Sequence, residues 1–239
     1  MTSPPPPPPF IFFDLGQTLI DEWEYIAYFD QKFLELLNGF GARIDQRNYR
    51  AVRNSIIRDR KIGHGSVKEL VIETCKLLSP PGYEKVIASR LESQIKQGRR
   101  DLFKFFDDAK PTLQALSKDC EMGIIANQSE DILELLEKSG FDRFFKVKVI
   151  SSSVKLKKPD SKIFELALRE AGQNAEDCIM VGDRLDTDIC PANNIGMTTI
   201  RTTNSLFSLQ VPKRACEHPS YTVARLSEMP DLLESIIIS

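Results

Sequence analysis

Short runs of consecutive hydrophobic residues recur along the chain and predict strands that are buried on both faces. The first run covers residues 10–13, and similar runs lie at 122–126, 147–150, 178–181 and 198–200. Between the later runs, hydrophobic residues repeat at helical spacing, for example in 132–136 and 163–168. This alternation of buried strands and amphipathic helices predicts an α/β fold, with a doubly wound, Rossmann-like parallel sheet covered by helices on both faces.

Residues 22–106 interrupt this alternation with helical patterns alone. Hydrophobic residues three to four positions apart form four stripes, which indicate four amphipathic helices. We therefore expect a helical-bundle cap over 22–106, inserted into an α/β core made of 10–21 and 107–239. Doubly wound sheets bind ligands outside the carboxyl ends of their strands, so an insertion after the first strand is placed to act as a lid. The four stripes are Ile26, Phe29, Phe33 and Leu37; Tyr49, Val52 and Ile56; Val67, Leu70, Thr74 and Leu78; and Val86, Ile87, Leu91 and Ile95.

The first nine residues end in six consecutive prolines, Pro4 to Pro9. Such a run donates no backbone hydrogen bonds and favours a polyproline II conformation. We expect residues 1–9 to form a disordered tail, with docking into an aromatic groove of a partner as the alternative.

Composition and charge exclude several classes of protein. The chain carries a net charge of −2, so it lacks the overall positive field that nucleic acids or anionic membranes would attract. Its longest hydrophobic runs fall far short of the roughly 20 residues that a membrane span needs, and no secretory signal pattern opens the chain. The five cysteines are scattered without a Cys-x-x-Cys pair, so we expect free thiols and a reducing cytoplasmic location.

Polar residues that can do chemistry follow several of the predicted strands. Asp14 follows the first strand, Asn127 and Gln128 the second, Lys158 comes after the third, and Asp183 follows the fourth. The carboxyl ends of parallel strands meet at one edge of a sheet, so we expect these side chains to converge on one crevice.

Together these groups suit the hydrolysis of a phosphate ester. An aspartate can attack phosphorus and divide hydrolysis into two easier displacements. A hard divalent cation held by Asp14, Asp183 and a backbone carbonyl would offset the repulsion between carboxylate and phosphate, which suits Mg²⁺. Lys158 would neutralise further negative charge, and Asn127 and Gln128 are candidates to bind the substrate.

The order and spacing of these groups resemble the haloacid dehalogenase superfamily over residues 10–235. The resemblance implies that Asp14 is the nucleophile, that Lys158 neutralises the phosphate, and that Mg²⁺ is bound by Asp14, Asp183 and the backbone carbonyl of Gly16. Asp188 matches the second acid of the last motif, at or behind the metal. The matching motifs are Asp14-x-x-x-Thr18, the Asn127 turn, Lys158-Pro159-Asp160-x-x-Ile163-Phe164, and Val181-Gly182-Asp183-x-x-x-x-Asp188.

Two positions depart from the phosphatase pattern of this superfamily. Gly16 stands where a second aspartate acts as general acid and base, and Ala126 stands where a hydroxyl residue binds phosphate. A positioned general acid contributes roughly 10²–10⁴-fold to the rate. Glu22, Glu24 and His64 are candidate replacement donors, and Gln17 is a candidate to orient a water.

We therefore expect a hydrolase, most of all a Mg²⁺-dependent phosphatase that acts on a small phosphorylated molecule through an aspartyl-phosphate intermediate. The first alternative is a 2-haloacid dehalogenase, since these members also lack the second aspartate. Phosphonate hydrolysis is less suited, because it calls for a Schiff-base lysine from a different cap. The remaining alternative is a non-catalytic binding protein that keeps the fold.

Overall fold

The computed structural model describes residues 9–64, 67–96 and 100–238, and it divides into two compact units. The core unit combines the chain up to Ile20 with Phe105–Ser208 and the chain from Pro212. The helical unit contains Asp21–Lys104 together with Leu209–Val211. Apart from Pro9, the expected polyproline tail lies outside the described residues. Within the described ranges, no helix is both long and apolar enough to cross a lipid bilayer.

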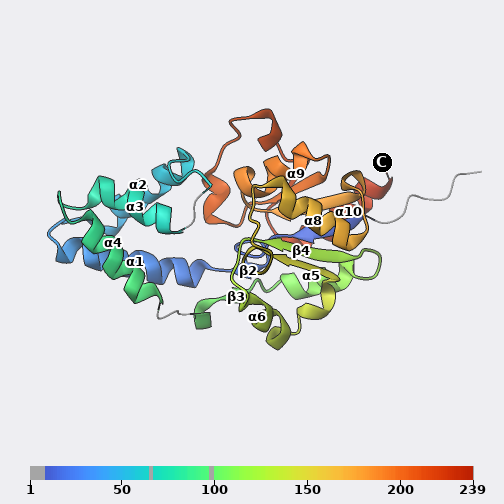
Figure 1. Cartoon of the computed structure of the whole chain (residues 1–239), viewed down its shortest axis with the longest axis horizontal. Helices are drawn as coiled ribbons and strands as arrows, with labels where there is room; N and C mark the ends of the chain where they lie inside the picture. Colours follow the sequence, from blue (N-terminus) through green and yellow to red (C-terminus); the bar gives the residue numbers. More distant parts are fainter. Residues whose placement is uncertain (1–8, 65–66, 97–99, 239) are drawn as a thin grey trace, which may run out of the picture. The chain divides into compact units, whose positions relative to one another are not determined.

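The core unit is built on a six-stranded parallel sheet with the order β5-β4-β1-β6-β7-β8 (Figure 1). The predicted α/β Rossmann-like core is therefore confirmed, and five of the strands coincide with the five hydrophobic runs. The sequence pattern does not predict the sixth strand, β8, because two of its three side chains are exposed. The strands are β1 (Phe10–Phe13), β4 (Met122–Ala126), β5 (Val147–Ile150), β6 (Cys178–Gly182), β7 (Thr198–Thr202) and β8 (Tyr221–Val223).

Strand β1 lies at the centre of this sheet, and all four of its side chains are buried. It pairs with β4 through Ile11 and Met122, and with β6 through Ile11 and Ile179. Successive side chains of a strand point to opposite faces. Phe10 and Phe12 therefore share one face, where they belong to the same buried cluster as Phe164 of helix α8 (Ser161–Ala171). Burial on both faces explains why the strand is uniformly hydrophobic.

Helices and short turns connect the strands of the core unit. The helices are α5 (Ala109–Leu116), α6 (Ile132–Ser139), α7 (Ser151–Val154), α8 (Ser161–Ala171), α9 (Cys190–Asn194) and α10 (Met229–Ile238). Short 3₁₀ turns are η2 (Asp142–Phe144), η3 (Ala175–Asp177), η5 (Leu206–Leu209), η6 (Ala215–Glu217) and η7 (Leu226–Glu228), and η4 (Leu185–Ile189) is a π-helical turn.

The helical unit contains the four helices that the hydrophobic stripes predict. They are α1 (Trp23–Gly39), α2 (Gln46–Arg58), α3 (Val67–Leu78) and α4 (Glu84–Lys96). A 3₁₀ turn, η1 (Arg100–Leu102), follows them, and the two-residue strands β2 (Ile20–Asp21) and β3 (Lys104–Phe105) pair where the chain leaves and re-enters the core.

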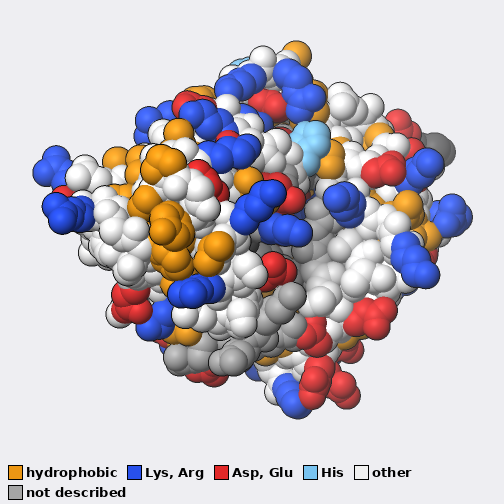
Figure 2. Space-filling model, turned by 60° about the vertical axis from the view of Figure 1, so that its left-hand side comes forward, with side chains coloured by type: hydrophobic (Ala, Val, Ile, Leu, Met, Phe, Trp, Pro, Cys, Tyr) orange, Lys and Arg blue, Asp and Glu red, His pale blue; other side chains and the backbone are white. Residues whose placement is uncertain are grey.

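The core of the helical unit contains most, but not all, of the predicted stripe residues. Phe29, Phe33 and Leu37 of α1 pack in one cluster with Tyr49 of α2 and with residues of α3 and α4. The expectation that Val86 belongs to this core is wrong, because its side chain is 42% exposed. Ile72 and Leu77 are exposed as well. Figure 2 shows hydrophobic side chains gathered on one part of the surface, with Lys and Arg side chains around them.

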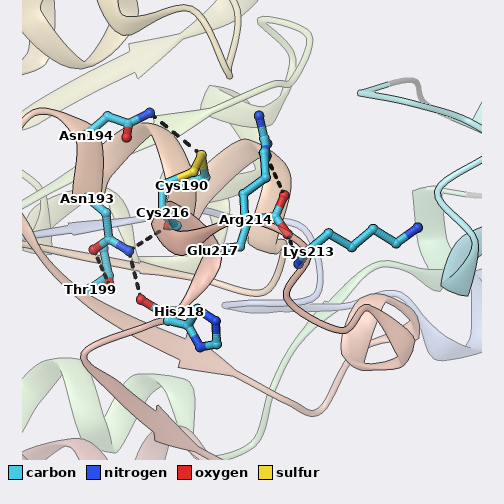
Figure 3. The surroundings of a disulfide bond; sticks show 9 residues. All are labelled: Cys190, Asn193, Asn194, Thr199, Lys213, Arg214, Cys216, Glu217 and His218. Atoms are coloured by element: carbon cyan, nitrogen blue, oxygen red, sulfur yellow. Dashed lines mark hydrogen bonds and ion pairs between the residues drawn. A yellow bond between two sulfur atoms is a disulfide. The ribbon is translucent and has the colours of Figure 1, made fainter.

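The cysteines give a second correction. Cys190, the first residue of α9, and Cys216 in η6 form a disulfide with a Cα–Cα distance of 4.5 Å (Figure 3). The expectation of free thiols holds for Cys75, Cys120 and Cys178, which are buried, but is wrong for this pair. The two cysteines are 26 residues apart without a recognisable motif, so only the packing of η6 against α9 brings them together.

Hydrogen bonds hold η6 in place beside the disulfide. The Asn193 side-chain amide donates to the carbonyls of Cys216 and His218, at 2.8 and 2.9 Å, and accepts from the Thr199 hydroxyl (Figure 3). The buried Glu217 carboxylate accepts from the backbone N–H of Lys213. The chain around Cys216 is therefore anchored to α9 by the Asn193 bonds as well as by the disulfide.

Candidate active site

Three buried carboxylates meet at the carboxyl end of the two central strands. Asp14 directly follows β1, Asp183 directly follows β6, and Asp188 lies in the π-helical turn η4. One oxygen from each carboxylate lies within 4.8 Å of the others. Their residues are 9%, 3% and 1% exposed, respectively. The sequence predicts the convergence of the first two from their strand ends, and the structure brings Asp188 to the same point.

Lys158 lies between two of these carboxylates. Its ammonium nitrogen is 2.6 Å from Oδ1 of Asp14 and 2.6 Å from Oδ1 of Asp188, and its side chain is 2% exposed. The Lys158–Pro159 peptide bond is cis. A buried ammonium that binds two carboxylates fixes both of them in orientation.

Asn127 holds the main chain of Lys158. Its Nδ2 donates to the Lys158 carbonyl at 2.9 Å, and its Oδ1 accepts from the Lys158 backbone N–H at 2.8 Å. The turn after β4 therefore positions the lysine, a role that the sequence does not reveal. The Nδ2 atom of Asn127 carries a second hydrogen, which could donate to a phosphate oxygen as predicted. The backbone carbonyl of Gln128 accepts from the hydroxyl of Ser151 and the N–H of Ser152, which ties the turn to α7.

Gly182 allows Asp188 to approach β6. A Cβ atom at Gly182 would lie 2.5 Å from the Cβ of Asp188, far inside van der Waals contact. The backbone N–H of Arg184 donates to the second oxygen of Asp188 at 3.0 Å. The glycine of the Gly182-Asp183 pair is therefore needed for the close packing of the last carboxylate.

The electrostatics of the cluster suit a divalent cation. Burial raises the pKa of Asp14 to about 6, Lys158 opposes the shift, and Asp188 adds to it. Burial, Asp188 and Asp14 together raise the pKa of Asp183 well above its ordinary value. Burial would lower the pKa of Lys158, but Asp14 and Asp188 outweigh it and the net shift is upward. Three acids around one ammonium leave excess negative charge in a buried site, and oxygen donors are what Mg²⁺ prefers.

The loop after β1 contains the first departure from the phosphatase pattern. Gly16 forms a single bridge with Ile20, and Gln17 has a φ of 53°, in the left-handed region that non-glycine residues rarely adopt. The Gln17 side chain is 3% exposed, and its Oε1 accepts from the backbone N–H of Leu206 at 2.9 Å. Gln17 is thus a buried structural partner of the segment after β7. The predicted metal contact of the Gly16 carbonyl stays a prediction.

The candidate proton donors all belong to the helical unit. Glu24 is exposed and pairs with Lys104 at 2.6 Å, and His64 is exposed. Their predicted role, and that of Glu22, stays a prediction.

Sequence reasoning misses Ser205, which follows β7. Its hydroxyl donates to Oδ2 of Asp183 at 2.5 Å, and its residue is 3% exposed. Ser205 belongs to none of the four motifs, and a serine in a polar segment after a strand gives no signal of its own.

Comparisons with known proteins show that the chain is similar to a family of hydrolases. The family model of the haloacid dehalogenase-like hydrolases matches residues 11–202. The glyceraldehyde 3-phosphate phosphatase of Methanocaldococcus jannaschii is 24% identical over 95% of this chain and 97% of that protein. The pyrimidine 5'-nucleotidase YjjG of Escherichia coli is 27% identical over 93% of this chain and 96% of that protein.

Solved structures share the fold. The putative hydrolase YfnB of Bacillus subtilis, solved with bound magnesium, aligns with a TM-score of 0.66 and 18% identity over 95% of this chain and 99% of that one. A predicted phosphoglycolate phosphatase of Haemophilus somnus aligns with a TM-score of 0.67 and 18% identity over 94% of this chain and 97% of that one. The family match, which covers most of the chain and all four motifs, establishes that this protein belongs to the haloacid dehalogenase-like hydrolases.

Proposed function

We propose that this hydrolase is a Mg²⁺-dependent phosphatase that cleaves a small phosphate ester through an aspartyl-phosphate intermediate on Asp14. The observation that carries the proposal is the buried cluster in which Lys158 binds Asp14 and Asp188 while Asp183 stands beside them. The chain's relatives include enzymes named as phosphatases of glyceraldehyde 3-phosphate and of N-acylneuraminate 9-phosphate. Their names support a small phosphorylated metabolite as the substrate class.

The cluster supports a two-step displacement. A carboxylate oxygen of Asp14 attacks phosphorus, and an O–P bond forms as the P–O bond to the alcohol breaks. The alcohol oxygen keeps the bonding electrons and takes up a proton. Water then attacks the phosphorus of the aspartyl phosphate, which releases inorganic phosphate and restores the Asp14 carboxylate.

The charged residues around Asp14 prepare it for this reaction. Lys158 donates to one Asp14 oxygen, which leaves the other for attack, and its positive charge offsets the charge of an arriving phosphate. Asp14, Asp183 and Asp188 would hold Mg²⁺, with the Gly16 carbonyl as a further candidate ligand. The bound ion would supply Lewis-acid stabilisation of the phosphoryl oxygens.

Gly16 gives the proposed reaction a distinctive dependence on the leaving group. Without a carboxyl at this position, the departing alcohol must draw its proton from water, from the substrate itself or from one of the candidate donors of the helical unit. The missing acid corresponds to roughly 3–5 kcal/mol of barrier for a poor leaving group and to little for a good one. We expect the rate to rise steeply as the pKa of the leaving alcohol falls.

The test is phosphate release from a series of aryl phosphates whose phenols differ in pKa, with and without Mg²⁺. Asp14→Asn should abolish release, because an amide is not a nucleophile towards phosphorus. Asp119→Asn is the matched control, since Asp119 is exposed and precedes β4 at the opposite end of the strand. Release that survives Asp14→Asn would rule out the mechanism.

A wild-type protein that releases no phosphate from the most activated ester, at any Mg²⁺ concentration, would refute the phosphatase proposal. Halide release from 2-haloacids is then the assay to make. The buried Asp183 and Asp188 beside Asp14 favour the phosphatase, because displacement of a halide by a carboxylate has no need of a metal.

A further inference from the structure

The segment after β7 holds the carboxylate of Asp183 through one hydroxyl. Ser205 Oγ lies 2.5 Å from Asp183 Oδ2 and accepts a hydrogen bond from the backbone N–H of Phe207 at 2.8 Å. A backbone N–H can only donate, so the serine oxygen is the acceptor in that bond. An ionised carboxylate can only accept, so the hydroxyl hydrogen points at Asp183. The direction of both bonds is therefore fixed.

The main chain of Asp183 is linked to the same segment through Arg201. Arg201, at the end of β7, donates from Nε to the Asp183 carbonyl at 3.3 Å and from a terminal nitrogen to the Phe207 carbonyl at 2.8 Å. The guanidinium of Arg184 lies 4.3 Å from the centre of the Phe207 ring. The turn that contains Ser205 is thus fixed against both Asp183 and the residue after it.

The same turn also reaches the loop after β1. The backbone N–H of Leu206 donates to Oε1 of the buried Gln17 at 2.9 Å. Gln17 follows Gly16 and lies three residues after Asp14. Ser205 therefore binds the carboxylate of Asp183, and the next residue, Leu206, binds the loop that contains Asp14.

We propose that Ser205 is a positioning residue for Asp183, which fixes the orientation of its carboxylate towards the metal. Rotation of the carboxylate would break the buried hydrogen bond between the Ser205 hydroxyl and Oδ2. The inference rests on the proposed function, because it assigns Asp183 to a metal site. Removal of hydrogen-bond partners behind metal ligands typically costs about 10–100-fold in metal affinity.

The experiment measures metal binding directly, with Mn²⁺ as a paramagnetic substitute for Mg²⁺. The electron paramagnetic resonance signal of free Mn²⁺ gives the dissociation constant for the wild type, Ser205→Ala, Ser205→Thr and Ser208→Ala. Ser208 is the matched control, because it is an exposed serine in the same turn. We expect Ser205→Ala to weaken Mn²⁺ binding about 10–100-fold, Ser205→Thr to restore affinity by keeping the hydroxyl, and Ser208→Ala to match the wild type.

Two further measurements separate positioning from a general loss of structure. Far-ultraviolet circular dichroism of the metal-free variants establishes that they are folded. Phosphate release by Ser205→Ala should recover towards the wild-type rate as the metal concentration is raised to saturation, which a distorted fold would not show. Binding of Mn²⁺ by folded Ser205→Ala within twofold of the wild type would overturn the inference.

The same data distinguish this inference from the proposed function. A protein that binds Mn²⁺ in a Ser205-dependent way but releases no phosphate would retain the positioning role and lose the phosphatase proposal. A wild-type protein that binds no Mn²⁺ would overturn the metal site and the role of Ser205 together.

Discussion

The disulfide between Cys190 and Cys216 should contribute a measurable part of the stability of the core unit. The perturbation is its reduction by a dithiol, which transfers two electrons and two protons to the sulfurs and becomes oxidised to its own disulfide. Reduction frees a loop of 26 residues in the unfolded chain. The loop-closure relation gives an entropy change of about 12 cal/mol/K for this length, or about 3.5 kcal/mol at 25 °C.

The native contacts around the disulfide should survive its reduction. The Asn193 side chain still binds the carbonyls of Cys216 and His218, and Glu217 still accepts from Lys213. The effect should therefore arise mainly in the unfolded state, so that the fold is retained while the free energy of unfolding falls. For a slope of about 2–3 kcal/mol/M in urea, the transition midpoint should fall by about 1–2 M.

The assay is urea unfolding followed by circular dichroism, with and without the dithiol. A Cys190→Ser, Cys216→Ser double variant should unfold at the same midpoint in both conditions, whereas Cys120→Ser, which removes a free thiol, should keep the full response. Alkylation of the unfolded, unreduced wild type should label three cysteines and spare two. Labelling of all five, or a reductant effect below about 1 kcal/mol, would refute the reasoning.

Three further predictions concern the candidate site. Gly182→Ala should lower phosphate release at least about 100-fold by displacing Asp188, whereas Gly39→Ala, whose Cβ would meet nothing within 4 Å, should leave it unchanged. The pKa of Asp14 is raised to about 6, so the folded protein binds more protons than the unfolded chain between about pH 4 and 6. The contribution of this group to stability is therefore lost as the pH rises through 6. Because the ionised carboxylate is the form that binds a cation, Mg²⁺ should raise the melting temperature more at pH 7 than at pH 5. Equal shifts at the two pH values would contradict this. Lys158→Met should destabilise the metal-free protein by about 3–5 kcal/mol in urea unfolding, because two buried carboxylates lose their ammonium partner, and a loss below about 1 kcal/mol would count against that pairing.

The sequence predicts the parts of the fold that depend on burial alone. Residues 10–13 are buried on both faces of the sheet, and a strand in that position must be uniformly hydrophobic, so its pattern is unambiguous. Strand β8 lies at the edge of the sheet and buries one side chain of three, so its pattern resembles that of a loop. Val86 has a core-like sequence pattern but is exposed, because the neighbouring Ile87 lies on the buried face of α4.

The candidate site divides in the same way. Asp14 and Asp183 could be predicted because they follow buried strands whose ends meet. Ser205 could not, since its role depends on a hydrogen bond across 22 residues of chain that only the packing of β7 beside β6 creates. The Cys190–Cys216 pair is missed for the same reason, because the sequence around a cysteine does not indicate which distant cysteine it pairs with.

The central place of β1 has a consequence for the order in which the chain folds during synthesis. Phe10–Phe13 leave the ribosome before their partners on β6, which are about 170 residues further along. At about 5–20 residues per second, this hydrophobic strand waits roughly 10–30 s for its second neighbour. The helical unit is formed almost entirely from one continuous stretch, Asp21–Lys104, whose contacts are complete much sooner. A nascent chain that stalls before β6 should therefore present a folded helical unit and a hydrophobic strand β1 with one edge unpaired, an aggregation-prone segment of the kind that chaperones bind.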